Sequence, residues 1–189
     1  IAALLQGQAQ KKKILPADVQ IKIATQAAPV EFRAGAKVYG YDEAGKFTTL
    51  REGTNGYICL GPELNSSTYY AYCYPESLEP FMARGREITN EGKRKERDKI
   101  REEEYKAGKL SIPSQPTTLY GYWGSADKVN AETGEMSDAK RRYVIYIPYA
   151  KAADLGLSNK GNNLGTPWLM DEGTYKAHIM ITPPLSHNH

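Results

Sequence analysis

Residues 56–60 read GYICL, and residues 69–74 read YYAYCY. Aromatic and β-branched residues dominate both segments, which is typical of β-strands. The intervening residues 61–67, GPELNSS, are typical of a loop. We therefore expect a hairpin that brings Cys59 and Cys73 side by side. In an oxidising compartment the two cysteines would form a disulfide, and two free buried thiols are the alternative.

Strand signals continue on both sides of this hairpin. Alternating apolar residues at Val19, Ile21 and Ile23 predict a strand near the start of the chain. Further strand-like segments are residues 36–41, 47–50, 117–123, 142–149 and 177–181, and a helical turn is expected at 150–155. Short strands at this spacing predict a mainly β domain, an antiparallel sandwich or barrel, with an α+β fold as the alternative.

A charged segment at about residues 88–108 interrupts the strand pattern. Oppositely charged residues four positions apart, such as Glu91–Lys95 and Glu102–Lys106, support one long inserted helix. Only Ile100 and Tyr105 offer apolar anchors, so this helix would project into solvent or bridge to another molecule. We consider a docking arm and a solvated surface insertion as alternatives.

The first residues, IAALLQGQAQ, have the composition of the end of a signal peptide. Residues 1–13 are therefore interpreted as a signal-peptide remnant or an N-terminal arm. Residues 14–185 form the single domain, and 186–189 are a tail. No later window approaches the roughly 18 apolar residues of a transmembrane helix. We expect an exported protein of the periplasm, cell surface or extracellular space.

The composition of the chain excludes one class of partner and is unusually rich in tyrosine. The net charge of +3 over 189 residues is small, so no nucleic-acid partner is expected. The chain has 14 tyrosines and only 3 phenylalanines. Tyrosine rings suit both half-wet sheet faces and a binding platform for a sugar, peptide or protein. The candidate binding residues are Tyr70, Tyr72, Tyr120, Tyr122, Trp123, Trp168 and Tyr175.

Catalytic motifs are missing from the sequence, including the common hydrolase, metalloprotease and nucleotide-binding patterns. His178 is the one histidine outside the tail, and it could pair with Asp171 or Glu172 as an acid–base unit. The alternative is a histidine hydrogen-bonded within a sheet. We expect neither a cofactor nor a metal site, because the cysteines lack partners at ligand spacing.

Two stretches resemble a group of exported bacterial proteins of unknown activity. Residues 53–59, GTNGYIC, followed by a second cysteine, resemble the group's G-T-N-G-W/Y-x-C motif. Residues 167–170, PWLM, and 173–180, GTYKAHIM, resemble its ending, which includes G-T-x-x-x-H-L/I-M. The resemblance implies export, the paired cysteines and His178 as part of a shared pattern, but no activity. Tyr175 departs from the group's proline, and the charged segment is particular to this chain.

Together these features predict a non-catalytic exported protein, an accessory or structural subunit of an envelope or extracellular assembly. Its partner would be another protein or a second copy, bound through the N-terminal arm and the charged helix. The alternative is an envelope hydrolase or glycan-binding protein. It would use a cleft near His178, with Asp171 and Glu172 beside Tyr175 and Trp168.

Overall fold

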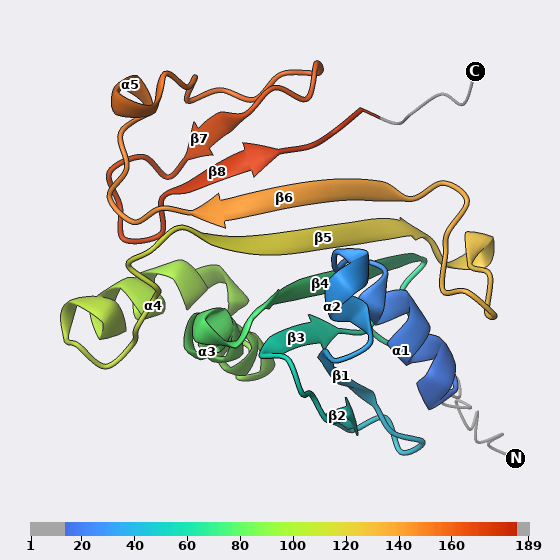
Figure 1. Ribbon diagram of the computed structural model, residues 1–189. Helices are drawn as coiled ribbons and strands as arrows, with labels where there is room; N and C mark the ends of the chain where they lie inside the picture. Colours follow the sequence, from blue (N-terminus) through green and yellow to red (C-terminus); the bar gives the residue numbers. More distant parts are fainter. Residues whose placement is uncertain (1–13, 185–189) are drawn as a thin grey trace, which may run out of the picture.

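The computed structural model describes residues 14–184, and within them the strands form one eight-stranded sheet (Figure 1). The order across the sheet is β2-β1-β3-β4-β5-β6-β8-β7. Neighbouring strands are antiparallel except β1 and β3, which are parallel. The strands are β1 (Lys37–Tyr41), β2 (Phe47–Arg51), β3 (Tyr57–Leu60), β4 (Thr68–Pro75), β5 (Thr117–Ser125), β6 (Lys140–Tyr146), β7 (Trp168–Met170) and β8 (His178–Ile181).

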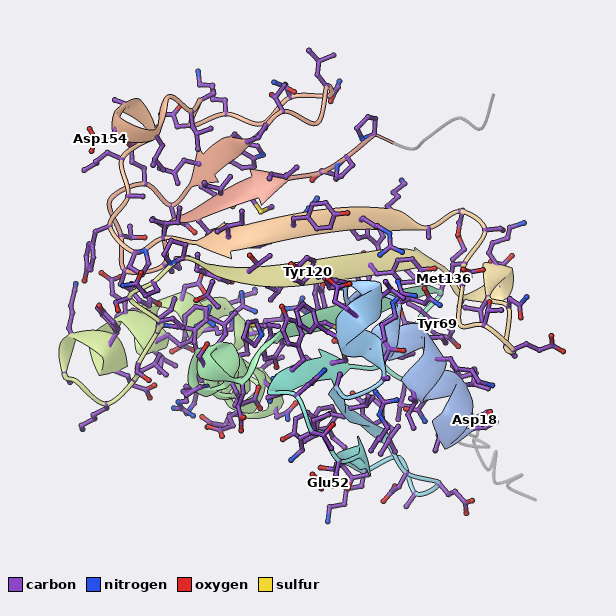
Figure 2. All side chains as sticks on the ribbon, in the orientation of Figure 1. Asp18, Glu52, Tyr69, Tyr120, Met136 and Asp154 are labelled. Atoms are coloured by element: carbon purple, nitrogen blue, oxygen red, sulfur yellow. A yellow bond between two sulfur atoms is a disulfide. The ribbon has the colours of Figure 1, made fainter. Side chains whose placement is uncertain are left out.

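The prediction of a β-rich domain is confirmed at the level of this large sheet, but the sandwich or barrel is wrong. The sheet stays open, with β2 and β7 as its edges. Helices rather than a second sheet cover its faces, as the α+β alternative allows. Side chains fill the space between helices and sheet on both faces (Figure 2).

The predicted strand at residues 19–23 is wrong, because these residues lie in helix α1 (Ala17–Thr25). Its buried residues include Val19, Gln20, Ile23 and Ala24, a spacing that places them on one side of a helix. Gln20 also ties the helix to the sheet. Its Nε2 donates to Tyr41 O at 2.8 Å, and its Oε1 accepts from Tyr41 N at 2.8 Å. A short helix, α2 (Val30–Arg33), follows.

The expected hairpin is present as β3 and β4, and Cys59 and Cys73 form a disulfide between directly opposed residues, with their Cα atoms 4.2 Å apart. Both cysteines have no exposed surface. They belong to the core under α1, where Cys73 Sγ lies 3.2 Å from Ala24 O. The first face of the sheet is therefore closed by α1 over the disulfide.

The opposite face is covered by α3 (Glu79–Asn90) and by residues Leu110 and Ile112. A short 3₁₀ turn, η1 (Glu76–Leu78), precedes α3. Leu78 and Phe81 pack there against Tyr74 and other residues of the sheet. The two faces thus have separate cores.

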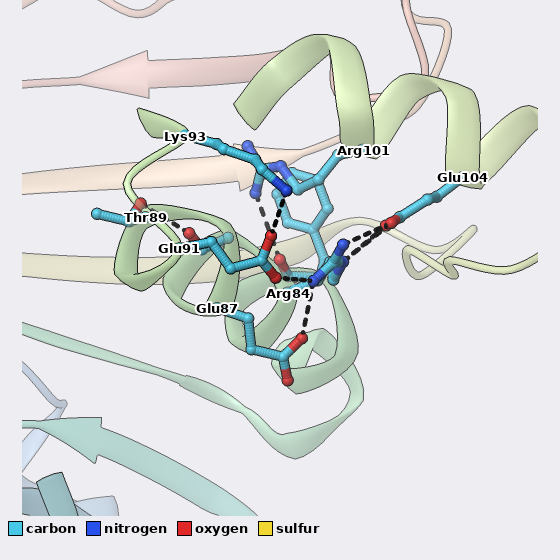
Figure 3. Close-up of polar contacts among 9 residues, drawn as sticks. Arg84, Glu87, Thr89, Glu91, Lys93, Arg101 and Glu104 are labelled. Atoms are coloured by element: carbon cyan, nitrogen blue, oxygen red, sulfur yellow. Dashed lines mark hydrogen bonds and ion pairs between the residues drawn. The ribbon is translucent and has the colours of Figure 1, made fainter. Parts of the chain in front are cut away.

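The single charged helix predicted at about 88–108 is also wrong, since the segment contains the end of α3 and a second helix, α4 (Arg97–Lys106). Gly92 has φ +78° in the turn after α3, a conformation that glycine adopts without steric cost. The 3₁₀ turn η2 (Arg94–Glu96) leads into α4. Arg84 joins the two helices, donating to Glu104 at 2.7 Å and pairing with Glu87 and Glu91 (Figure 3).

Helix α4 is anchored to the domain rather than projecting from it. Tyr105 stacks on Tyr175 with ring centroids 4.9 Å apart. It is therefore an apolar anchor of the helix, as the sequence predicts. Arg101 is buried, with its guanidinium 3.9 Å from the centroid of the Phe81 ring. Asp98 accepts from Arg101 at 3.0 Å and from Lys176 at 2.8 Å. These charged residues replace the apolar stripe that the sequence lacks.

The remaining expectations have mixed outcomes. The helical turn near 150–155 is α5 (Ala152–Leu155), and Gly156 ends it in the left-handed conformation. The edge strand β7 was not predicted. The interpretations of residues 1–13 and of the tail, with His187 and His189, lie outside the described residues. In residues 14–184 no helix has the length and apolar character needed to cross a membrane.

Candidate functional site

A hollow of about 160 Å³ opens on the sheet over strands β4, β5 and β6. It lies on the face that carries α3 and borders the core of that face, since the lining residues Leu119 and Val144 are members of that core. The strand registers build it in rows. Tyr70 pairs with Trp123, and in the next row Tyr72 pairs with Gly121, which pairs with Arg142. The hollow is lined by Tyr70, Tyr72, Leu119, Gly121, Trp123, Arg142 and Val144.

Gly121 creates the hollow, because it is the only lining position without a side chain. A Cβ atom added there would lie 3.4 Å from Arg142 O and 3.7 Å from the Tyr72 ring, both ordinary contact distances. The strand therefore has room for at least a methyl side chain at this position, which would occupy part of the hollow. Glycine weakens a strand interior and often marks close approach of another group. Here its lack of a side chain leaves room for a ligand.

Aromatic rings form the walls on one side of Gly121. Tyr70 and Trp123 have nearly parallel rings, 6.4 Å between centroids and 15° between planes. Tyr70 and Tyr72 are arranged similarly, with centroids 6.4 Å apart. Tyr70 is 43% exposed, which is high for a residue of its size within a sheet. These three side chains bring polar tips and apolar faces to one opening.

Arg142 forms the opposite wall, and its guanidinium is held in place from two sides. Its Nε donates to Thr182 Oγ1 at 3.1 Å, and its Cζ lies 5.2 Å from the Trp123 ring centroid. Neither Nη group has a hydrogen bond or ion pair with a described residue. Arg142 is exposed, so the two Nη groups remain available to a ligand.

The charged groups near the hollow affect the pKa of the Tyr72 hydroxyl. Burial raises this pKa, and Tyr70 and Glu63 act in the same direction. Arg142 and Arg94 act in the opposite direction, by stabilising the phenolate. The Tyr72 hydroxyl is therefore within electrostatic reach of two cations and one carboxylate.

The other predicted binding residues lie elsewhere. Tyr120 and Tyr122 lie on the opposite face, where Tyr122 belongs to the core under α1 and Tyr120 packs against that core. Tyr120 is labelled in Figure 2. Tyr122 is buried there, and its hydroxyl accepts a hydrogen bond from Met136 N at 2.7 Å. Trp168 is on the edge strand β7, beside Gly161. Tyr175 is buried beneath α4, where it contacts Phe81 and Tyr105. These four residues are separate from the hollow.

His178 lies within the sheet, on β8, where it is paired with Tyr146 of β6 and with Met170 of β7. Its Nδ1 is 2.8 Å from Lys176 O and 4.0 Å from Asp171 Oδ2, and its ring packs 5.3 Å from the Tyr146 ring. Burial lowers the pKa of His178, despite the opposing effect of its contact with Lys176 O. Asp171 instead pairs with Lys176 at 3.3 Å.

Glu172 is engaged in a structural contact. Its Oε1 accepts a hydrogen bond from Ala152 N at 2.9 Å, at the start of α5. The three acid–base candidates therefore lie in one region, but their contacts are mainly with neighbouring backbone and with Lys176. Among residues 14–184 no group of three or more metal-ligating side chains lies close enough together to hold an ion.

Sequence reasoning missed four residues of the hollow: Leu119, Gly121, Arg142 and Val144. Strand alternation could have found two of them, because Leu119, Gly121 and Trp123 occupy alternate positions of β5. The same alternation separates Trp123 from Tyr120 and Tyr122. Arg142 and Val144 depend on how β6 pairs with β5, which the strand pattern does not determine.

Comparison of this chain with family models, with curated proteins and with solved structures found no significant match.

Proposed function

We propose that this chain is a non-catalytic exported protein that acts by binding, and that the hollow around Gly121 is its ligand site. The observation that carries this proposal is the arrangement of Gly121 between aromatic walls and the Arg142 guanidinium, whose two Nη groups have no partner among the described residues. Ligand sites are concave and mostly apolar, with a few polar groups that fix orientation. The hollow has this composition on a small scale.

The size of the hollow favours one ring of a ligand rather than a whole drug-sized molecule. Pockets for such molecules are roughly 300–1,000 Å³, whereas a cavity near 150 Å³ accepts a single six-membered ring. A sugar unit in an oligosaccharide fits this description, because a pyranose has apolar C–H faces and a polar rim. Tyr70, Tyr72 and Trp123 offer matching apolar faces and polar tips. A glycan is therefore the ligand that we propose, at this hollow rather than near His178.

Export is supported by the buried disulfide, since disulfides persist in oxidising compartments. A bound glycan would suit a protein of the cell envelope or its surroundings. We also propose that the protein is part of a larger assembly, which a separate experiment tests.

A matched pair of variants on β5 tests the binding site. Gly121→Val fills the hollow without removing a wall, and Thr118→Val adds the same side chain to the opposite face of the same strand. We expect a glycan array to show ligands retained by the wild type and by Thr118→Val but lost by Gly121→Val. Equal retention by Gly121→Val, or no retained glycan for the wild type, would refute the proposal.

The charged helices favour a second role, docking to a protein partner, which the sequence analysis assigned to one helix. Lys93, Arg94 and Lys95 are exposed at the turn between α3 and α4. Deleting the segment would remove core residues such as Arg101, so charge reversal is the better test. Reversing all three to glutamate should abolish co-purification of a partner under native conditions. Reversing Lys46, Lys128 and Lys160, which are exposed cations outside α3 and α4, should leave it intact. An unchanged set of co-purifying proteins in the first variant would contradict docking at this turn.

A further inference from the structure

From the electrostatics of the hollow, we infer that its ligand is an acidic saccharide, in which a carboxylate on the bound sugar ring pairs with Arg142. This inference rests on the proposed function and adds the charge class of the ligand. It depends on three properties of the site: the fixed guanidinium, its unused donors and the charge balance of the surroundings.

The guanidinium is fixed before a ligand arrives. The hydrogen bond from Arg142 Nε to Thr182 and the contact with the Trp123 ring restrain the side chain at two points. An arginine restrained in this way loses less conformational entropy on binding than a free one. Preorganised charge is typical of a site that recognises an oppositely charged group.

The unused donors match a carboxylate. With Nε bound to Thr182, the two Nη groups keep their hydrogens free of partners among the described residues. Paired guanidinium donors recognise planar carboxylates in a bidentate manner. A neutral sugar would leave these donors to water, whereas a carboxylated sugar would use both. A neutral ligand would therefore leave the charged Nη donors of Arg142 without a protein or ligand partner.

The surrounding charges also favour an anion. Arg94 and Arg142 both influence the Tyr72 phenol, against Glu63 alone among the carboxylates. Lys93 and Lys95 flank Arg94 on the exposed turn η2, and Lys140 pairs with Trp123 on β5. An acidic saccharide bound in the hollow would therefore meet positive charge from Arg94 and Lys140 in addition to Arg142.

Two hydroxyls and an indole N–H complete the recognition. The Tyr70 and Tyr72 hydroxyls and Trp123 Nε1 make no hydrogen bond with any described residue. They can therefore donate to or accept from the hydroxyl rim of a sugar ring. An apolar peptide side chain would leave these groups unpaired, which favours a saccharide over a peptide.

The experiment uses the full chain and a panel of pyranose oligosaccharides in matched pairs. Each pair contains an oligosaccharide with uronic acid units and its carboxyl-reduced, neutral form. Affinities are measured by titration calorimetry for the wild type, Gly121→Val, Arg142→Met, Arg142→Lys and Lys140→Met. The Lys140→Met variant is the matched control, because it removes one positive charge from the same strand without altering the lining of the hollow.

We expect the wild type to bind at least one acidic member more tightly than its neutral partner, by roughly tenfold to a hundredfold. Arg142→Met should abolish this preference, and Arg142→Lys should restore only part of it because lysine lacks the planar fork. Lys140→Met should keep most of the preference. Added salt should weaken the acidic ligand more than the neutral one.

The outcomes separate this inference from the proposed function. If neutral members bind as tightly as acidic ones and Gly121→Val abolishes both, the glycan site stands and the acidic preference is wrong. If Arg142→Met and Lys140→Met reduce the preference equally, general charge rather than Arg142 is responsible, and the inference is wrong. If no member of the panel binds, or only peptides do, both the inference and the proposed glycan function fail.

Discussion

At the scale of single residues, burial changes the proton affinity of several tyrosines in this chain. Burial raises the pKa of both Tyr146 and Tyr175 to about 12. Nearby Arg101 acts in the opposite direction in each case but does not reverse the effect. The phenols are therefore neutral in the folded protein at pH values where free tyrosine ionises.

This shift makes the fold sensitive to alkali. Because the folded pKa exceeds the unfolded value near 10, the folded state holds more protons, and the free energy of unfolding decreases as pH rises. The stabilisation is fully present below about pH 10 and is lost progressively toward pH 12. Urea unfolding at pH 9, 10 and 11, with tyrosinate absorbance recorded in parallel, measures it. The double variant Tyr146→Phe, Tyr175→Phe should lose stability less steeply over this range, and an equally steep loss would contradict the assignment.

His178 gives an opposite test at acid pH. Burial lowers its pKa below the ordinary value of 6.5, so the unfolded state binds the proton more readily. Its contribution to stability is present above about pH 6.5 and is lost as pH falls through the folded pKa. We expect the NMR titration of the His178 ring to have a midpoint below 6.5, with His178→Gln providing the assignment. A midpoint above 6.5 would show that the Asp171 carboxylate affects the His178 pKa more strongly than burial does. It would then support the acid–base pair of His178 and Asp171.

At the scale of elements, the attachment of α4 depends on a half-exposed carboxylate. Asp98 accepts hydrogen bonds from Lys176 and Arg101, which join α4 to the chain before β8. Burial alone would raise the pKa of Asp98, but these two cations lower it overall. Removing the carboxylate would leave Arg101, a buried residue, without its ion-pair partner.

We therefore expect Asp98→Ala to lower the free energy of unfolding at pH 7 by about 1–2 kcal/mol, less than for a fully buried pair because Asp98 is partly solvated. Glu103→Ala is the matched control on the same helix, and it should change stability by less than about 0.5 kcal/mol. Urea unfolding measures both. As pH falls below the unfolded value near 4, the Asp98 contribution is lost and the difference between wild type and Asp98→Ala should shrink. A difference that does not shrink between pH 4 and pH 2 would point to packing rather than charge.

Elements differ in how well the sequence predicts them. Strands β1 to β6 and β8 were located to within a few residues, because alternation and turn residues mark them locally. Helix α1 was assigned as a strand because Val19, Ile21 and Ile23 satisfy a period of two, while Val19, Gln20, Ile23 and Ala24 satisfy the helical period. Tertiary packing over the disulfide favours the helix, and this packing is not visible in a short window of sequence.

The hollow illustrates the same limit. Residue type alone makes Tyr70, Tyr72 and Trp123 candidate binding residues. It makes Tyr120 and Tyr122 equally good candidates. Only the alternation along β5 distinguishes them, and only the pairing of β5 with β6 brings Arg142 to Gly121. Which strands become neighbours is a long-range property of the chain, so the guanidinium could not be placed from sequence.

At the scale of the whole molecule, the two faces of the sheet have different roles. One face is closed by α1 over the disulfide, and the other is shared between the α3 core and the open hollow. A single open sheet with a core on each side differs from a sandwich, in which one core lies between two sheets. The hollow proposed as the binding site borders the α3 core on the second face.

The disulfide supports this arrangement by constraining the unfolded chain. Cys59 and Cys73 are 14 residues apart, and closing a loop of about 15 residues contributes roughly 3 kcal/mol. We expect the double variant Cys59→Ala, Cys73→Ala to lose about this amount in urea unfolding. Wild-type protein unfolded in the presence of a reducing agent should show the same loss. An unchanged free energy of unfolding would show that the bridge is dispensable for the fold.

The burial of that disulfide also has a consequence for the order of assembly. Oxidation by thiol–disulfide exchange requires an oxidant to reach at least one of the two sulfur atoms, yet neither cysteine has exposed surface once α1 is in place. Oxidation therefore precedes the docking of α1 or occurs during its transient release. Helix α1 precedes the described strands, so it is synthesised before the β3–β4 hairpin but docks only after, or while, that hairpin is oxidised. The order in which these two elements are made is therefore the reverse of the order in which they reach their final positions.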